Sequence, residues 1–171
     1  TTEIYTLSLH DALPISDILI LGKALSGGVM PVSAVLADND IMLTIKPGEH
    51  GSTFGGNPMA ARVAVAALTV VKEEKLAERA EALGQIFREE MRNINSEMIE
   101  LVRGKGLLNA VVIRPKNGKE AWDVCVEMAK NGLLAKPTHQ HIIRFAPPLV
   151  ISEEELRAAI EIIRKSILAF E

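Results

Sequence analysis

The short apolar run at residues 18–21 constrains this chain most, because a lysine and a glycine-rich turn follow it directly. Four consecutive apolar residues bounded by an aspartate and a glycine predict a short strand that is buried on both faces. Lys23 then stands at the end of that strand, where substrates reach the sheets of α/β proteins. The pattern therefore makes Lys23 a candidate active-site residue.

Lys23 has two interpretations from its local pattern alone. Partial desolvation at the end of a buried strand would disfavour the charged ammonium form, and a neutral amine can attack a carbonyl group to form a Schiff base. The alternative is an ordinary solvated lysine at a strand end, since most lysines in proteins are solvated.

The loop at residues 46–58 is a second candidate segment, because it is dense in Gly, Ser, Thr and Asn. Its backbone amides are free to face an anion, and its glycines allow a ligand to approach closely. Ser52 and Thr53 lie in the middle of this loop. A phosphate cradle is one interpretation, and an ordinary glycine-rich turn is the other.

Arg144 is a candidate for binding a carboxylate. It follows two isoleucines and precedes Phe145, so we expect its aliphatic stem to be packed and its guanidinium to be partly desolvated. A guanidinium in that setting can hold a carboxylate with two parallel hydrogen bonds. The alternative is an arginine in a structural ion pair.

Periodicity predicts the remaining elements. A helix opened by Asn57 and Pro58 is apolar nearly all round and is expected to be buried. Asp38 is expected to cap a short helix, and Ser152 with Glu155 forms a capping box before the last helix. The expected helices are 39–43, 58–73, 75–94, 120–131 and a final one from 153, and the expected strands are 32–37, 99–102, 107–113, 133–135 and 142–145.

Three segments together resemble the class III aminotransferases that use pyridoxal 5'-phosphate (PLP), in the subgroup with ornithine and acetylornithine aminotransferases. The segments are residues 22–28, which read GKALSGG, residues 46–58, and residues 132–149, which include AKPTH and RFAPPL. Several motifs in the right order are far more specific than any one of them. The last segment favours the ornithine branch of this subgroup.

The resemblance implies an α/β fold, namely the C-terminal part of a fold-type-I PLP transferase. Residues 17–57 would be a piece of the large PLP-binding domain, residues 58–74 the interdomain helix, and residues 75–171 the small domain. An upstream region would carry the aspartate that pairs with the pyridine nitrogen. We therefore expect this chain alone to be inactive and to expose apolar surface where that region would pack.

The resemblance also assigns roles to four residues. Lys23 would hold PLP as a Schiff base and move a proton during catalysis. Ser52 and Thr53 would bind the cofactor, Thr53 giving its hydroxyl to the phosphate of the neighbouring subunit in a homodimer with shared active sites. Arg144 would grip the α-carboxylate of the amino acid or oxo-acid substrate.

The implied activity is transfer of the δ-amino group of ornithine to a 2-oxo acid, giving glutamate 5-semialdehyde and an amino acid. Acetylornithine or another ω-amino acid is the nearest alternative donor. A non-catalytic interaction module, in which Lys23 is incidental, is an alternative from another class. The implied location is the cytoplasm or the mitochondrial matrix.

The first sixteen residues fit neither helical nor strand periodicity. Residues 2–15 correspond, codon for codon, to one frame of a common short-read sequencing adapter. We therefore expect residues 1–16 to be an artefact outside the fold, and the authentic reading frame to continue upstream of Asp17.

Composition argues against several other classes of function. The formal net charge is −3 and no basic block occurs, which disfavours nucleic acid as a partner. Cys125 is the single cysteine, so an internal disulfide is impossible and a reducing compartment is favoured. No apolar run is long enough to span a bilayer, and no Cys or carboxylate cluster accompanies the histidines to form a metal site. Gly22-Lys23 lacks the upstream glycine and the following Ser or Thr of a nucleotide-binding P-loop.

Overall fold

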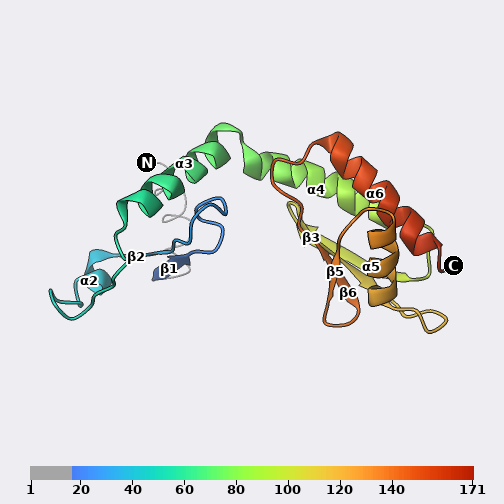
Figure 1. The fold of residues 1–171 in the computed structure, drawn as a ribbon, viewed down its shortest axis with the longest axis horizontal. Helices are drawn as coiled ribbons and strands as arrows, with labels where there is room; N and C mark the ends of the chain where they lie inside the picture. The colour runs from blue at the N-terminus through green and yellow to red at the C-terminus, as the bar shows by residue number, and fades with distance from the viewer. Residues whose placement is uncertain (1–16) are drawn as a thin grey trace. The chain divides into compact units, whose positions relative to one another are not determined.

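The computed structural model describes residues 17–171. The chain divides into two compact units with the boundary between Glu74 and Lys75, and Figure 1 labels the elements of each. The expected artefact at residues 1–16 lies outside the described residues. Within the described part, no helix is both long and apolar enough to cross a bilayer.

The first unit contains a two-stranded sheet followed by two helices (Figure 1). Strands β1 and β2 pair antiparallel, with Leu19 opposite Leu36. The two expected strands are thereby confirmed, although β2 is shorter than the predicted range 32–37. The elements are β1 (Ile18–Leu21), β2 (Ala34–Ala37), α2 (Asn39–Met42) and α3 (Pro58–Glu73).

The prediction of full burial for β1 and α3 is wrong for the described residues. In β1, Ile18 is 47% exposed and Ile20 is 73% exposed. Helix α3 buries only Ala60 and Ala64, while Val65 and other apolar side chains reach the surface. A strand or an all-apolar helix is buried only when layers cover every face, and the described part of this unit covers one face of each. The expected exposed apolar surface is therefore present.

The two described helices of the first unit begin differently. Asn57 caps α3 as predicted, its side-chain oxygen accepting hydrogen bonds from the amides of Met59 at 2.9 Å and Ala60 at 3.3 Å. Asp38 is the N-cap residue of α2 as predicted and has the extended backbone of a cap, but its side chain forms no capping hydrogen bond. The carbonyl of Asp38 instead accepts from the amides of Ile41 and Met42, which is sufficient for one exposed turn.

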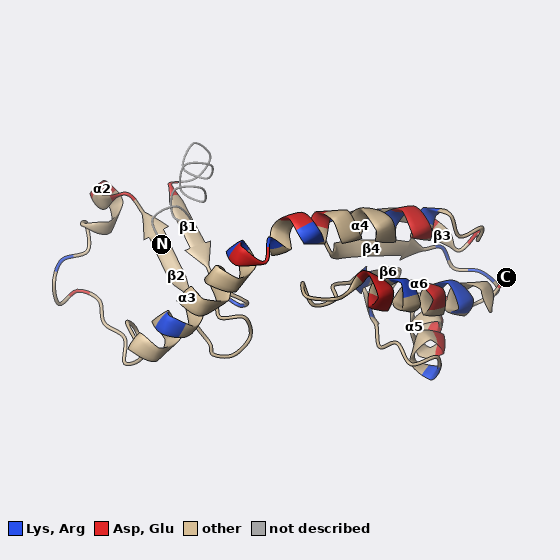
Figure 2. Ribbon diagram, turned by 90° about the horizontal axis from the view of Figure 1, so that it is seen from above, with Lys and Arg blue, Asp and Glu red and all other residues tan. Residues whose placement is uncertain are grey.

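The second unit packs helices on a four-stranded antiparallel sheet, with strand order β3-β4-β6-β5 (Figure 1). Figure 2 shows that acidic residues of this unit lie along its helices. The elements are α4 (Leu76–Arg92), β3 (Ile99–Lys105), β4 (Leu108–Ile113), α5 (Ala121–Lys130), β5 (Lys136–Thr138), β6 (Ile142–Phe145) and α6 (Glu153–Leu168).

One face of this sheet belongs to the core and the other is open. The cross-strand row of Val102, Val111 and Ile143 is buried against helix residues such as Met128 and Ile160. Residues one position along each strand point to the opposite face, because side chains alternate in a strand. The open face therefore carries the residues on either side of the buried row.

A buried polar cluster ties α4 to the β3–β4 turn. Arg88, only 8% exposed, donates to the Gly106 carbonyl at 3.0 Å, to Asn109 Oδ1 at 2.9 Å and to Glu81 Oε1 at 2.9 Å. Glu81 Oε2 accepts from the Gly106 amide, and this hydrogen bond, aided by the charges of Lys105 and Arg88, lowers the pKa of the Glu81 carboxyl. The cluster fixes the turn on the helix.

Strand β5 begins later than the predicted range 133–135. The amide of Leu133 donates to the carbonyl of Met128 at 2.9 Å, and Gly132 has φ +93°, so both residues complete the C-terminal cap of α5. Pairing starts at Lys136, and Pro137 is tolerated because β5 is an edge strand. The capping box of Ser152 and Glu155 is confirmed.

Candidate functional site

Lys23 lies in a tight turn directly after β1. Its φ of 55° falls in the left-handed region, which is uncommon for a residue other than glycine. Successive hydrogen bonds shape the turn, from the Leu25 amide to the Gly22 carbonyl at 3.2 Å and from the Gly27 amide to the Ala24 carbonyl at 2.9 Å. The lysine is thus fixed at the strand end by local backbone geometry.

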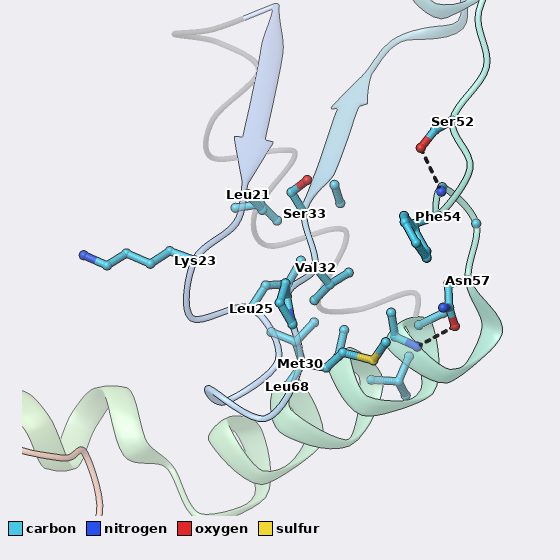
Figure 3. Close-up of a pocket in the computed structure, with 18 of the residues that line it drawn as sticks. Leu21, Lys23, Leu25, Met30, Val32, Ser33, Ser52, Phe54, Asn57 and Leu68 are labelled. Atoms are coloured by element: carbon cyan, nitrogen blue, oxygen red, sulfur yellow. Dashed lines mark hydrogen bonds between the residues drawn. The ribbon is translucent and has the colours of Figure 1, made fainter.

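The side chain of Lys23 is exposed, so the expected partial desolvation is absent from the described structure. Its neighbours Gly22 and Ala24 are small and exposed themselves, and they cannot cover a long side chain. Figure 3 shows the side chain extending away from the other labelled residues. Among residues 17–171, none forms a hydrogen bond or ion pair with the Lys23 ammonium, which leaves this amine accessible.

Ser26 stabilises the turn after Lys23, a role that the motif alone did not indicate. It is 1% exposed, and its hydroxyl accepts from the Met30 amide at 3.1 Å and donates to the Met30 carbonyl. Gly27 has φ +66°, and a Cβ there would lie 3.5 Å from the Cβ of Ala67 on α3. The turn is therefore anchored internally by Ser26 and packed closely on α3.

The loop before α3 is folded by hydrogen bonds of its own side chains. Ser52 Oγ accepts from the Gly55 amide at 2.9 Å, and its O–H remains able to donate to a ligand. A Cβ at Gly55 would lie only 2.9 Å from the Cβ of Ser52, so this turn requires glycine. Thr53 is exposed and is next to Ser52 in the chain.

A cavity of about 1080 Å³ lies between the Lys23 turn, β2, the 52–57 loop and α3 (Figure 3). Lys23 and Ser52 both line it, whereas Thr53 does not. Two of the three cofactor residues expected in this unit therefore border the same cavity, with the Lys23 side chain extending away from Ser52 (Figure 3). The apolar part of the lining comes from residues that include Leu21, Leu25, Met30, Phe54 and Leu68.

The cavity lining suits part of a PLP molecule. Lys23 offers an accessible amine, Ser52 offers a hydroxyl, and Gly56 with φ +72° leaves space beside its backbone. No carboxylate lines the cavity among the described residues, so the group expected to pair with the pyridine nitrogen is not supplied here. An amine and a hydroxyl thus border the cavity, although the Lys23 side chain extends away from the other labelled residues, and no described residue supplies a carboxylate for a pyridine ring.

Arg144 lies on β6 in the second unit, directly opposite Ala110 of β4 and Lys136 of β5. Its side chain is exposed, so the expected packing of its stem is wrong. The reason is strand alternation, because Ile143 faces the core and its neighbour Arg144 must face outward. Within the described residues Arg144 has no ion-pair partner, and the alternative of a structural ion pair is therefore not supported.

Arg144 also lines a recess of about 370 Å³. The recess is bordered by Leu134, Ala135, Lys136 and Ala146, so two cations flank one small space. An anion in the recess would meet a guanidinium and an ammonium from adjacent strands. The geometry suits a carboxylate.

Cys125 and the histidines are not candidates for a catalytic or metal-binding role in the described residues. Burial raises the pKa of the Cys125 thiol to about 11, which keeps it protonated and unreactive at neutral pH. Across the described part of the chain, no group of three or more His, Cys, Asp or Glu side chains could hold a metal ion. The candidate chemistry therefore rests on Lys23, the 52–57 loop and Arg144.

Comparison with known proteins gives concordant matches. The family described as aminotransferase class-III matches residues 3–167. The mitochondrial ornithine aminotransferase of Rattus norvegicus is 62% identical over 154 residues, covering 90% of this chain and 35% of the rat enzyme. The family match begins at residue 3, within the segment 1–16 that we expect to be an artefact. The structure does not describe that segment, so this expectation stays a prediction.

Two solved structures superpose closely. An acetylornithine aminotransferase from Elizabethkingia anophelis has a TM-score of 0.84 and 61% identity, covering 90% of this chain and 39% of that one. The ornithine aminotransferase of Toxoplasma gondii, whose active site holds PLP at partial occupancy, has a TM-score of 0.84 and 52% identity, covering 90% and 37%.

These neighbours confirm the predicted α/β fold of fold-type-I aminotransferases. The chain spans about a third of the length of the curated relatives that it matches, 35% in the case of the rat enzyme.

Proposed function

The chain belongs to the class-III aminotransferase family, and from this premise we propose that it is part of a PLP-dependent ornithine δ-aminotransferase. The reaction transfers the δ-amino group of ornithine to a 2-oxo acid, giving glutamate 5-semialdehyde and an amino acid. The observation that carries this proposal is the 62% identity to the rat enzyme of that name over 90% of the chain.

Lys23 is the proposed catalytic residue. PLP, when bound, supplies an electron sink for the carbanion formed at the substrate carbon. Lys23 provides the amine for the covalent link to PLP, and after substrate binding the same amine carries a proton at the reacting carbon. Its exposed position beside the cavity, without a described partner, supports this role.

The remaining site residues bind and orient. Ser52 would donate its O–H to the cofactor phosphate, since its oxygen already accepts from the Gly55 amide. Thr53 is exposed and does not line the cavity that Ser52 lines, which supports a contact with the cofactor of a neighbouring subunit in a homodimer. Arg144 would hold the α-carboxylate of the oxo acid with two parallel hydrogen bonds.

We propose the mitochondrial matrix or the cytoplasm as the location. The rat relative is named mitochondrial, while the relative from Saccharomyces cerevisiae is named without a compartment. A reducing compartment also agrees with the single buried cysteine. The proposed reaction uses small-molecule substrates and requires neither a membrane nor a nucleic acid as a partner.

Acetylornithine is the second candidate donor, because a structure named acetylornithine aminotransferase is 61% identical to this chain. Other ω-amino acids belong to the same alternative. The two donors differ at the α-amino group, which is free in ornithine and acylated in acetylornithine. Comparing kcat/KM for the two donors therefore separates the hypotheses.

The proposal is tested in a chimera in which residues 17–171 replace the matched segment of the rat enzyme. We expect ornithine- and 2-oxo-acid-dependent formation of glutamate 5-semialdehyde, and loss of at least about a thousandfold in kcat on Lys23→Ala, because the covalent link and proton transfer both disappear. Lys165→Ala, at an exposed position on α6, should retain activity. We expect the 171-residue chain alone to be inactive.

Two outcomes would count against this function. A folded chimera that binds PLP but shows no transamination with any ω-amino acid would contradict it. A Lys23→Ala chimera with full activity would remove the catalytic role of Lys23 and favour the alternative of a non-catalytic interaction module.

A further inference from the structure

A row of cations crosses the open face of the second unit's sheet. Arg103 of β3 lies opposite Ala110 of β4, Ala110 lies opposite Arg144 of β6, and Arg144 lies opposite Lys136 of β5. Residues opposite each other in antiparallel strands share a face. The three cationic side chains are all exposed, which places them on the face away from the helices.

No carboxylate balances this row within the sheet. Among the residues of the four described strands the one acidic side chain is Glu100, which falls at the register shift between Ile99 and Leu101. Other cations of the same unit, including Arg88, Lys116, Arg157 and Arg164, have carboxylate partners within 4 Å. Lys136 and Arg144 have none in the described part of the chain.

The closest pair in the row is Lys136 and Arg144, because they lie on adjacent strands. Adjacent strands are about 4.8 Å apart, so the two side chains leave the sheet from neighbouring positions on the same face. Like charges directly opposite each other destabilise a strand pair unless an anion lies between them. The recess of about 370 Å³ that both residues line is the space in which such an anion would sit.

We propose that Lys136 is a second binding residue for the carboxylate that Arg144 holds, because the two residues pair across adjacent strands and line one recess. This inference rests on the proposed function, which supplies a carboxylate as the ligand. Arg144 binds the two carboxylate oxygens in a parallel fork. Lys136 donates from the neighbouring strand to a lone pair that the fork leaves free.

Arg103 is the natural control, because it belongs to the same row and the same open face. It is separated from Arg144 by β4, which places its Cα two strand spacings, or about 10 Å, away. It is not among the residues that line the recess. Ala110 between them has no charge, so Arg103 contributes to the field of the sheet and not to the recess.

The test is anion binding by the 171-residue chain, followed by nuclear magnetic resonance. The probe is glutarate, an inert five-carbon dicarboxylate, and glutaramide of the same length is the uncharged control. We expect glutarate to shift the resonances of Lys136 and Arg144, and we expect glutaramide to leave these resonances unchanged. Lys136→Gln should raise the Kd for glutarate about fivefold, because one charge-assisted hydrogen bond is lost. Arg144→Gln should raise this Kd about tenfold or more.

Arg103→Gln should change the Kd by less than about twofold, since that residue lies outside the recess. Amide spectra of each variant report whether the fold is intact. A Kd for Lys136→Gln equal to that of Arg103→Gln, or no glutarate binding by the native chain, would overturn the proposal.

A kinetic comparison in the rat chimera distinguishes binding from structural effects. Lys136→Gln should raise KM for 2-oxoglutarate about fivefold with kcat nearly unchanged, because the residue holds substrate and does not reach the reacting carbon. A fall in kcat with KM unchanged would contradict the assigned role. If PLP does not attach to Lys23 but glutarate still binds, the proposed function would be refuted. The anion-binding role of Lys136 and Arg144 would remain supported.

Discussion

At the scale of single residues, the cluster around Arg88 shows how close approach determines sequence. Gly84 on α4 faces the β3–β4 turn, and a Cβ there would lie 1.8 Å from the Gly106 carbonyl oxygen. Because that atom belongs to the backbone, rotation of a side chain cannot relieve the clash. Glycine at this helical position is required by packing and is not explained by helix propensity.

Gly84→Ala should therefore destabilise the chain, although alanine is favoured over glycine by about 1 kcal/mol in helices. We expect a net loss of about 2 kcal/mol in the free energy of unfolding, as for other overpacked sites. Urea denaturation followed by circular dichroism measures it. Glu89→Ala, at an exposed position on the same helix, should change stability by less than about 0.5 kcal/mol. Equal stability of Gly84→Ala and native chains would contradict the packing argument.

Glu81 makes the same cluster sensitive to acid. Its pKa in the folded chain is lowered by the hydrogen bond from Gly106, so its ionised form stabilises the fold above the ordinary glutamate pKa of 4.5. That contribution is lost as the pH falls below 4.5 through the lower folded-state pKa. Glu81→Gln should reduce the difference between urea midpoints at neutral pH and near pH 3.5. An unchanged difference would mean that other carboxylates, such as Asp123 and Glu171, account for it.

At the scale of elements, local sequence signals determined most helices and strands. Helix α3 occupies its predicted range, and the capping box of α6 forms with Ser152 Oγ accepting from the Glu155 amide at 3.1 Å. The misplaced strand at 133–135 has a physical cause. Leu133 is apolar and follows a helix, and periodicity alone does not reveal that its amide closes the helix cap.

Ser152→Ala should cost about 1 kcal/mol of stability, because one helical amide loses its partner. Thermal unfolding of the native chain and the variant provides the comparison. Ser152→Thr keeps the hydroxyl and should recover most of the loss. A variant with threonine as unstable as the one with alanine would show that the hydroxyl is not what stabilises the start of α6.

At the scale of the whole molecule, sequence motifs identified the candidate residues but not their surroundings. The motif around Lys23 indicated its position after β1, whereas its solvent exposure depends on which segments cover the turn. Arg144 was expected to be packed from its apolar neighbours, yet strand alternation places it on the open face. Arg144 lies opposite Lys136 because of the register between β5 and β6, and this register cannot be predicted from the local sequence of either strand.

The size of the chain limits what its residues do alone. It spans 35% of the length of the rat relative, and the cavity beside Lys23 is lined by no described carboxylate. Apolar side chains such as Ile20 and Phe54 are 73% and 81% exposed. These observations agree with a segment whose chemistry requires further parts of a longer enzyme.

Covalent attachment of PLP to Lys23 tests the proposed catalytic role of this residue most directly. The rat chimera is incubated with PLP, reduced with borohydride and digested, and the peptides are mapped by mass spectrometry. We predict one phosphopyridoxyl group on the peptide that contains Lys23, and none after Lys23→Ala. Absence of the adduct from that peptide in a folded chimera, or equal labelling of several exposed lysines, would show that Lys23 is not the residue that binds PLP.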